Sequence, residues 1–76
     1  MNPFPPSDDS FNRLHRSGWS VGEVRLTTAA GLRWIVTGTN GENAIRVEAP
    51  SQAEAWFRAC QQAEGVGMLD GFNRTI

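Results

Sequence analysis

The dipeptide Asn40-Gly41 constrains this chain most, because it marks a tight turn between two stretches of alternating apolar residues. A two-residue hairpin loop of type I′ needs positive φ at both central positions, and Asn-Gly accepts this readily. The expected cross-strand pairs are Thr39 with Glu42, Val36 with Ile45, Trp34 with Val47 and Leu32 with Ala49. This register gathers the apolar residues of both strands on one face.

A second turn is predicted at Ala29-Ala30-Gly31, which matches a three-residue hairpin loop with glycine at the left-handed position. The expected pairs are Thr28 with Leu32, Leu26 with Trp34 and Val24 with Val36. The buried face then continues into the first strand. Before Val24 the apolar alternation changes phase, so we expect a β-bulge at Gly22-Glu23.

A helix is predicted after the third strand. Ser51 is suited to cap it, and Glu54 three residues later completes a capping box. Its apolar stripe is expected to consist of Ala53, Trp56, Phe57, Cys60 and Ala63. Gly65 is expected to end it in a left-handed conformation. The predicted fold class is therefore α+β, a three-stranded antiparallel meander sheet with one helix packed on one face, so that Trp34 contacts Trp56.

The chain divides into a proline-rich arm with a short helix at 1–18, a βββα domain at 19–69 and a C-terminal tail at 70–76. Three of the four prolines fall within residues 1–6, which favours a mobile arm. Ser7 is a candidate cap for the short helix, and Gly18 is suited to end it. Near the other end, we expect residues 68–69 to fold back on the core and Asp70-Gly71 to form a turn.

Length and charge restrict the class of protein. Seventy-six residues allow one domain with a small core. The net charge of −1 is opposite in sign to that of a general polyanion binder. No apolar run is long enough to span a membrane, and the first ten residues lack the basic start and apolar centre of a secretion signal. These features favour a cytoplasmic protein.

Residues with catalytic or metal-binding chemistry are few. His15, the single histidine, suits the end of a helix, and Cys60 lies on the buried stripe as a small core hydrophobe. One histidine and one cysteine give no paired ligand spacing for a metal, and Asp8-Asp9 suit a helix start. Gly65 and Gly67 follow a helix, whereas a phosphate-binding loop must open one. We therefore expect no enzyme, no metal site and no cofactor.

The candidate binding face is the sheet surface turned away from the helix. Its expected rows are Glu23, Thr37 and Ala44; Arg25, Ile35 and Arg46; and Thr27, Arg33 and Glu48. The candidate site residues on it are Arg25, Arg33, Ile35 and Arg46. Three interpretations stay open: a solvated face on which Arg33 pairs with Glu48, an interface with a protein or a second copy, and a nucleic-acid interface.

Three strands followed by a helix that begins Ser51-Gln52-Ala53-Glu54-Ala55 resemble the DNA-binding domain of plant ethylene-response factors and the arm-binding domain of some tyrosine integrases. The plan is also similar to that of small uncharacterised bacterial proteins. The resemblance covers residues 19–64 and implies that Arg25, Arg33 and Arg46 contact DNA in the major groove. The chain departs from these families in having no lysine. The sequence favours a small non-catalytic module for protein interaction or self-association, with DNA binding as the alternative.

Overall fold

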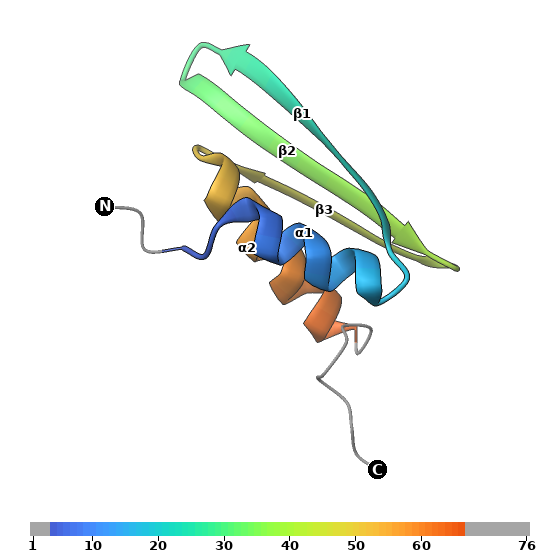
Figure 1. Cartoon of the computed structure of the whole chain (residues 1–76). Coiled ribbons are helices and arrows are strands. Elements are labelled where there is room, and N and C mark those ends of the chain that lie inside the picture. The colour runs from blue at the N-terminus through green and yellow to red at the C-terminus, as the bar shows by residue number, and fades with distance from the viewer. Residues whose placement is uncertain (1–3, 67–76) are drawn as a thin grey trace.

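The computed structural model describes residues 4–66. Its elements are α1 (Ser7–Arg16), β1 (Ser20–Thr28), β2 (Gly31–Asn40), β3 (Asn43–Ala49) and α2 (Gln52–Gly65). The strands form one antiparallel sheet in the order β1-β2-β3, and both helices lie on the same side of it (Figure 1). The predicted α+β meander with a C-terminal helix is confirmed, and the short N-terminal helix is present. The predictions for residues 68–76 lie outside the described residues.

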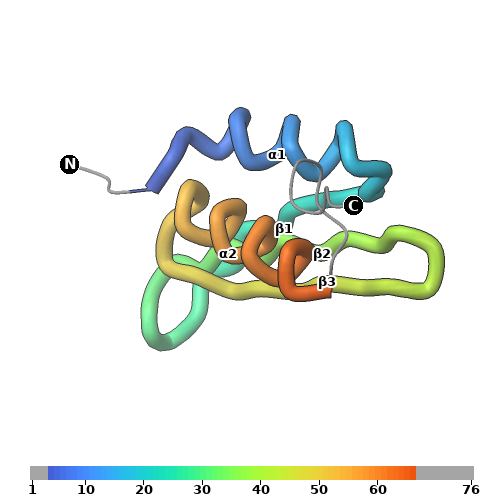
Figure 2. The backbone as a smooth tube through the Cα atoms, turned by 90° about the horizontal axis from the view of Figure 1, so that it is seen from below, coloured from blue at the N-terminus to red at the C-terminus, as the bar shows by residue number. Residues whose placement is uncertain are grey.

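The core lies between the sheet and the helices. α2 packs on β2 and β3, and α1 packs on α2 and on β1 (Figure 2). The buried apolar residues are Leu14, Trp19, Val36, Ile45, Val47, Ala49, Ala55, Trp56, Ala59, Cys60 and Ala63. α1 therefore contributes to the same core as the βββα elements.

The β2–β3 hairpin turns one residue later than predicted. Asn40 pairs with Asn43, so the loop is Gly41-Glu42, with Gly41 at φ 65°. The Asn40 amide instead donates a hydrogen bond of 3.1 Å to the Ser17 carbonyl, which ties the hairpin to the connection between α1 and β1. The cross-strand pairs thus differ from the predicted ones by two residues. A shift by an even number leaves each side chain on its predicted face.

The predicted β1–β2 register is wrong by one residue. Ala29 and Ala30 form a two-residue loop in place of the expected three-residue one. An odd shift turns the side chains of β1 over, so Val24 and Leu26 point away from the helices and are 54% and 43% exposed. The predicted bulge is also absent, because β1 pairs with β2 without interruption through Gly22 and Glu23.

The hydroxyl of Thr28 closes this shorter loop. It accepts a hydrogen bond from the Ala30 N–H at 3.1 Å and donates one to the Gly31 carbonyl at 2.9 Å. Gly31 has φ 115°, which a glycine adopts without the steric cost of a side chain. These contacts favour direct pairing of Thr28 with Gly31, and this pair fixes the register of the whole hairpin.

The Ser51 N-cap of α2 is confirmed, whereas the buried stripe and the end of the helix differ from the prediction. The Glu54 carboxylate of the expected capping box pairs with Arg58 one turn along the helix. The Ser51 hydroxyl accepts a hydrogen bond from the Glu54 N–H at 3.2 Å, as an N-cap should. The buried residues of α2 are Ala55, Trp56, Ala59, Cys60 and Ala63. Ala55 and Ala59 therefore take the places that the prediction gave to Ala53 and Phe57. Gly65 is the last helical residue, and the C-cap is Val66 with φ −99°, so Gly65 does not end the helix in a left-handed conformation as predicted.

α1 begins differently from the prediction. Its N-cap is Pro6, and Ser7 is its first helical residue, so the expected Ser7 cap is wrong. The Pro6 carbonyl accepts the first backbone hydrogen bonds of the helix. Leu14, on its inner face, is completely buried. Ahead of the helix, the ring of Phe4 lies 5.4 Å from that of Phe57 on α2.

Candidate interaction surface

The face of the sheet opposite the helices carries an apolar cluster. Val24 on β1 lies directly opposite Ile35 on β2, and Leu26 follows Val24 on the same face two residues along the strand. Val24 and Leu26 are exposed, and Ile35 is half-buried. We call Val24, Leu26 and Ile35 the outer patch. No helix in the described residues covers it.

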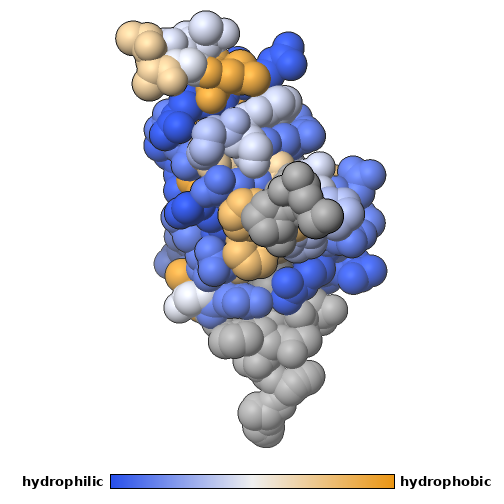
Figure 3. All heavy atoms as spheres, turned by 90° about the vertical axis from the view of Figure 1, so that its left-hand side faces the viewer, coloured by the Kyte–Doolittle hydropathy of each residue, from blue (hydrophilic) through white to orange (hydrophobic). Residues whose placement is uncertain are grey.

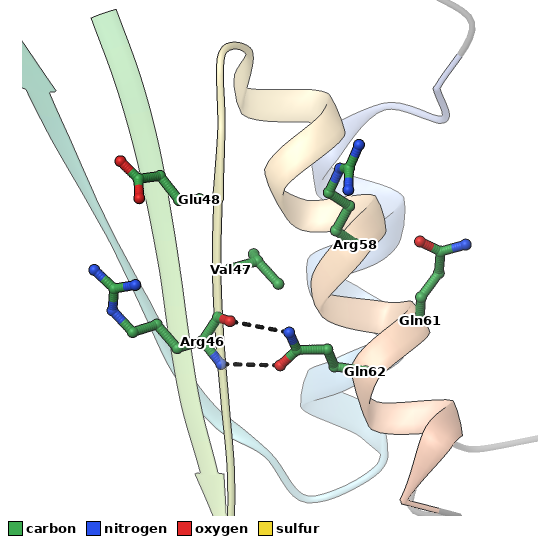
Figure 4. Close-up of a pocket in the computed structure, with 6 residues that line it drawn as sticks. All are labelled: Arg46, Val47, Glu48, Arg58, Gln61 and Gln62. Carbon is green, nitrogen blue, oxygen red and sulfur yellow. Dashed lines mark hydrogen bonds between the residues drawn. The ribbon is translucent and has the colours of Figure 1, made fainter.

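The outer patch is bordered by charges of both signs. Arg33 lies opposite Leu26, and its guanidinium is 3.7 Å from the Glu48 carboxylate, the ion pair that the solvated-face interpretation contains. Glu48 itself lies opposite Ile35 in the observed register. Arg46 and Glu48 on β3 both point away from α2 (Figure 4). Thus Ile35, Arg33 and Arg46 share the face on which the sequence placed them.

Arg25 does not belong to this face, and its predicted place there is a correction. The one-residue shift of β1 puts it on the helix side, where its guanidinium lies 5.5 Å from the centre of the Trp34 ring. A cation over an aromatic face is an attractive arrangement. The structure therefore brings together three of the four candidate residues, and it adds Val24 and Leu26, which the sequence had assigned to the core.

Glu23 explains why β1 turns its polar residues toward the helices. Its carboxylate accepts a hydrogen bond of 2.7 Å from the indole N–H of Trp56 and two from the Gln52 amide at 3.0 and 3.1 Å. Hydrogen bonds to an ionised acceptor are stronger than those between neutral groups. This contact fastens β1 to α2 and leaves the apolar side of the strand in solvent.

The β1–β2 hairpin projects beyond the helices (Figure 1). In the space-filling view, apolar residues are exposed at that end of the molecule, among a mainly hydrophilic surface (Figure 3). Leu32, near the tip, is 43% exposed. All of β1 is exposed except Val21, which is intermediate. The exposed apolar surface is therefore concentrated on this hairpin.

At the opposite edge of the sheet, a side chain of α2 binds the backbone of β3 at Arg46. The amide of Gln62 on α2 accepts a hydrogen bond from the Arg46 backbone N–H and donates one to the Arg46 carbonyl, both at 3.0 Å (Figure 4). A groove of about 420 Å³ follows this edge, lined by Arg46, Val47, Glu48, Arg58, Gln61 and Gln62. The Arg58 guanidinium is paired with Glu54. The backbone N–H and C=O of Arg46, at the edge of the sheet, are therefore hydrogen-bonded within the chain.

The residues with catalytic potential do not converge. His15 is exposed on α1 and stacks on Phe11, whereas Cys60 is buried on α2 and donates to the Ser10 carbonyl at 3.5 Å. Burial raises the pKa of the Cys60 thiol above its ordinary value of 9.0, which disfavours the reactive thiolate. Within residues 4–66, no three His, Cys, Asp or Glu side chains gather as a metal site would require.

None of the helices described here is long and apolar enough to cross a membrane. Comparison with protein-family models, with curated proteins and with solved structures finds no match to the chain. The functional argument is therefore built on the geometry of the outer patch and of the strand that carries most of it.

Proposed function

We propose that the chain is a non-catalytic protein-interaction module that acts by self-association through the outer patch and β1. The observation that carries this proposal is the exposure of β1, a nine-residue strand at the edge of the sheet that is open to solvent at every residue but Val21. Long edge strands with apolar side chains readily pair with another chain. Soluble domains usually shorten, charge or cover such edges.

The chemistry of the face favours a protein partner over nucleic acid. Interface cores between proteins are apolar and poor in charge, and the outer patch has that composition. Nucleic-acid binding draws most of its affinity from cations on phosphates. With Arg25 on the other side of the sheet, the face keeps Arg33 and Arg46, and Arg33 is already paired with Glu48.

A second copy is the partner that this charge distribution suits. The face carries both signs, with Arg33 and Arg46 against Glu48, so a copy of the same surface offers complementary charges. Most soluble oligomers are symmetric assemblies of identical chains, in which one patch meets itself.

Sedimentation equilibrium tests the proposal. We expect the mass of the unmodified chain to rise from 8.3 kDa toward twice that value as its concentration increases. Val24→Asp places a charge in the outer patch and should hold the protein at the monomer mass, because an unpaired charge is costly in a desolvated interface. Thr37→Asp, at an exposed position on the same face, is the matched control and should associate like the parent chain.

Circular dichroism should show that both variants keep the fold, since both sites are exposed. A parent chain that stays monomeric at every concentration would overturn the proposal, as would equal association of the two variants. A parallel titration with duplex DNA at low salt tests the alternative. Tight binding that falls with salt and weakens in Arg33→Ala and Arg46→Ala would favour nucleic acid.

A further inference from the structure

We infer that two copies join through β1, which pairs antiparallel with β1 of the partner so that two three-stranded sheets become one six-stranded sheet. This inference rests on the proposed self-association and specifies its geometry, which is the strand, the register and the residues that meet across the symmetry axis.

The backbone of β1 has hydrogen-bonding groups free to form such a pair. Thr28 and Gly31 flank a two-residue loop and exchange backbone hydrogen bonds, and in an antiparallel ladder such bonded positions alternate. The N–H and C=O groups of Glu23, Arg25 and Thr27 therefore point away from β2. No strand or side chain in the described part of the chain bonds to these groups.

The contrast with β3 identifies β1 as the edge left for a partner. The same alternation directs the backbone groups of Arg46 outward on β3, and there the Gln62 amide binds both of them. The chain itself thus binds the backbone of β3 at Arg46, whereas nothing described binds the outward backbone groups at the centre of β1. In Figure 1 the outer side of β1 beyond the connection from α1 is free of helices.

Charge selects the register. A two-fold axis through Val24 sets Glu23 opposite the partner's Arg25, and Arg25 opposite the partner's Glu23. Axes through Glu23 or through Arg25 would set like charges opposite each other, which is destabilising. The Glu23 carboxylate accepts three hydrogen bonds within its own chain and has acceptor capacity for a further donor. The register centred on Val24 is therefore the one in which both charges find partners.

The same register joins the two outer patches. Val24 meets the partner's Val24 as a non-hydrogen-bonded pair, in which the Cα atoms are about 4.5 Å apart. Leu26 lies opposite the partner's Gly22, and Gly22 has nothing within 4 Å of the position where a Cβ would lie. The leucine side chain therefore has room to cover the glycine, so apolar area is buried on the outer face as well.

Cysteine crosslinking tests this register. In Val24→Cys the Cα atoms of the two new cysteines have a separation within the range of about 4.4–6.8 Å that a disulfide needs. Mild oxidation should therefore give a covalent dimer. Leu26→Cys is the matched control on the same exposed face. There the thiol positions are four residues apart along the partner strand, about 13 Å, which is too far to bridge. Cys60 is buried and stays in both variants.

Charge reversal gives a second, non-covalent readout. Arg25→Glu replaces two opposite-charge pairs by two like-charge pairs and should weaken association by about tenfold. Arg58→Glu makes the same change in charge on α2, beside β3 and outside the outer face, and should leave association unchanged.

The outcomes separate this inference from the proposed function. If the parent chain associates in sedimentation but Leu26→Cys crosslinks as readily as Val24→Cys, the register is wrong and self-association stands. The same holds if Arg58→Glu weakens association as much as Arg25→Glu does. If the parent chain is monomeric throughout, the inference and the proposed function fail together.

Discussion

Replacing Glu23 by alanine should show how strongly β1 depends on its contact with α2. The carboxylate accepts the Trp56 indole N–H at 2.7 Å, and Trp56 is only 5% exposed. Leaving a buried donor without its partner costs about 1–3 kcal/mol. The Gln52 amide, which also binds the carboxylate, is only partly buried, so it can turn to water and adds little. We expect Glu23→Ala to lower the free energy of unfolding by about 1–2 kcal/mol.

That loss would be a large share of the total, since a chain of this length is stable by about 4–11 kcal/mol. Urea unfolding followed by circular dichroism measures it. Trp56→Phe removes the indole N–H and keeps a ring, so a double-mutant cycle with Glu23→Ala should give a coupling energy of about 1 kcal/mol. Glu42→Ala, an exposed glutamate in the β2–β3 loop, is the control and should change stability by less than about 0.5 kcal/mol. A coupling energy below about 0.3 kcal/mol would refute the reasoning.

Three further predictions concern the core. Leu14→Ala should cost about 2–5 kcal/mol in a chemical melt, because the side chain is completely buried, and a loss under about 1 kcal/mol would show that α1 is peripheral. Gly38→Ala should cost about 1–3 kcal/mol, since its Cβ would lie 2.7 Å from Cγ1 of Val21; an unchanged unfolding midpoint would contradict this. Burial raises the pKa of the Cys60 thiol, so this thiol ionises at lower pH in the unfolded chain than in the folded protein. The stability that the neutral, buried thiol contributes should be complete below pH 9.0. It should be lost at higher pH, as the folded thiol also ionises. A Cys60→Ala variant should lack this pH dependence, and rapid alkylation of native Cys60 at neutral pH would contradict its burial.

Elements set by local chemistry were predictable from the sequence. The Ser51 cap depends on residues three positions apart, and the α2 helix follows it directly. The turn after Asn40 lies within one residue of its predicted place, and the error preserved the face of β3. In each case the signal and the structure it specifies are neighbours in the chain.

The orientation of β1 depends on contacts that no local pattern reveals. Glu23 faces the helices because Trp56, thirty-three residues further along the chain, supplies a donor. The prediction took the apolar Val24 and Leu26 as core residues, yet a large part of any protein surface is apolar. Because of that assumption, the prediction placed Arg25 on the wrong face and did not identify the outer patch.

Much of the candidate face was nevertheless predictable. Ile35, Arg33 and Arg46 lie on β2 and β3, whose faces follow from the Asn-Gly turn whether the loop begins at Asn40 or at Gly41. The remaining part, on β1, depends on whether the first loop has two residues or three. The Thr28 hydroxyl decides this, and such hydroxyl contacts with a nearby backbone are typical of turns.

Amide hydrogen exchange of β1, followed by NMR at dilute and at high protein concentration, tests the self-association through this strand most directly. The amides of Val24 and Leu26 bond to β2 and should be protected at both concentrations. The amides of Glu23, Arg25 and Thr27 point outward and should exchange rapidly in dilute solution and become protected as the protein associates. Rapid exchange of these three amides at every concentration would contradict the pairing of β1 with a second copy.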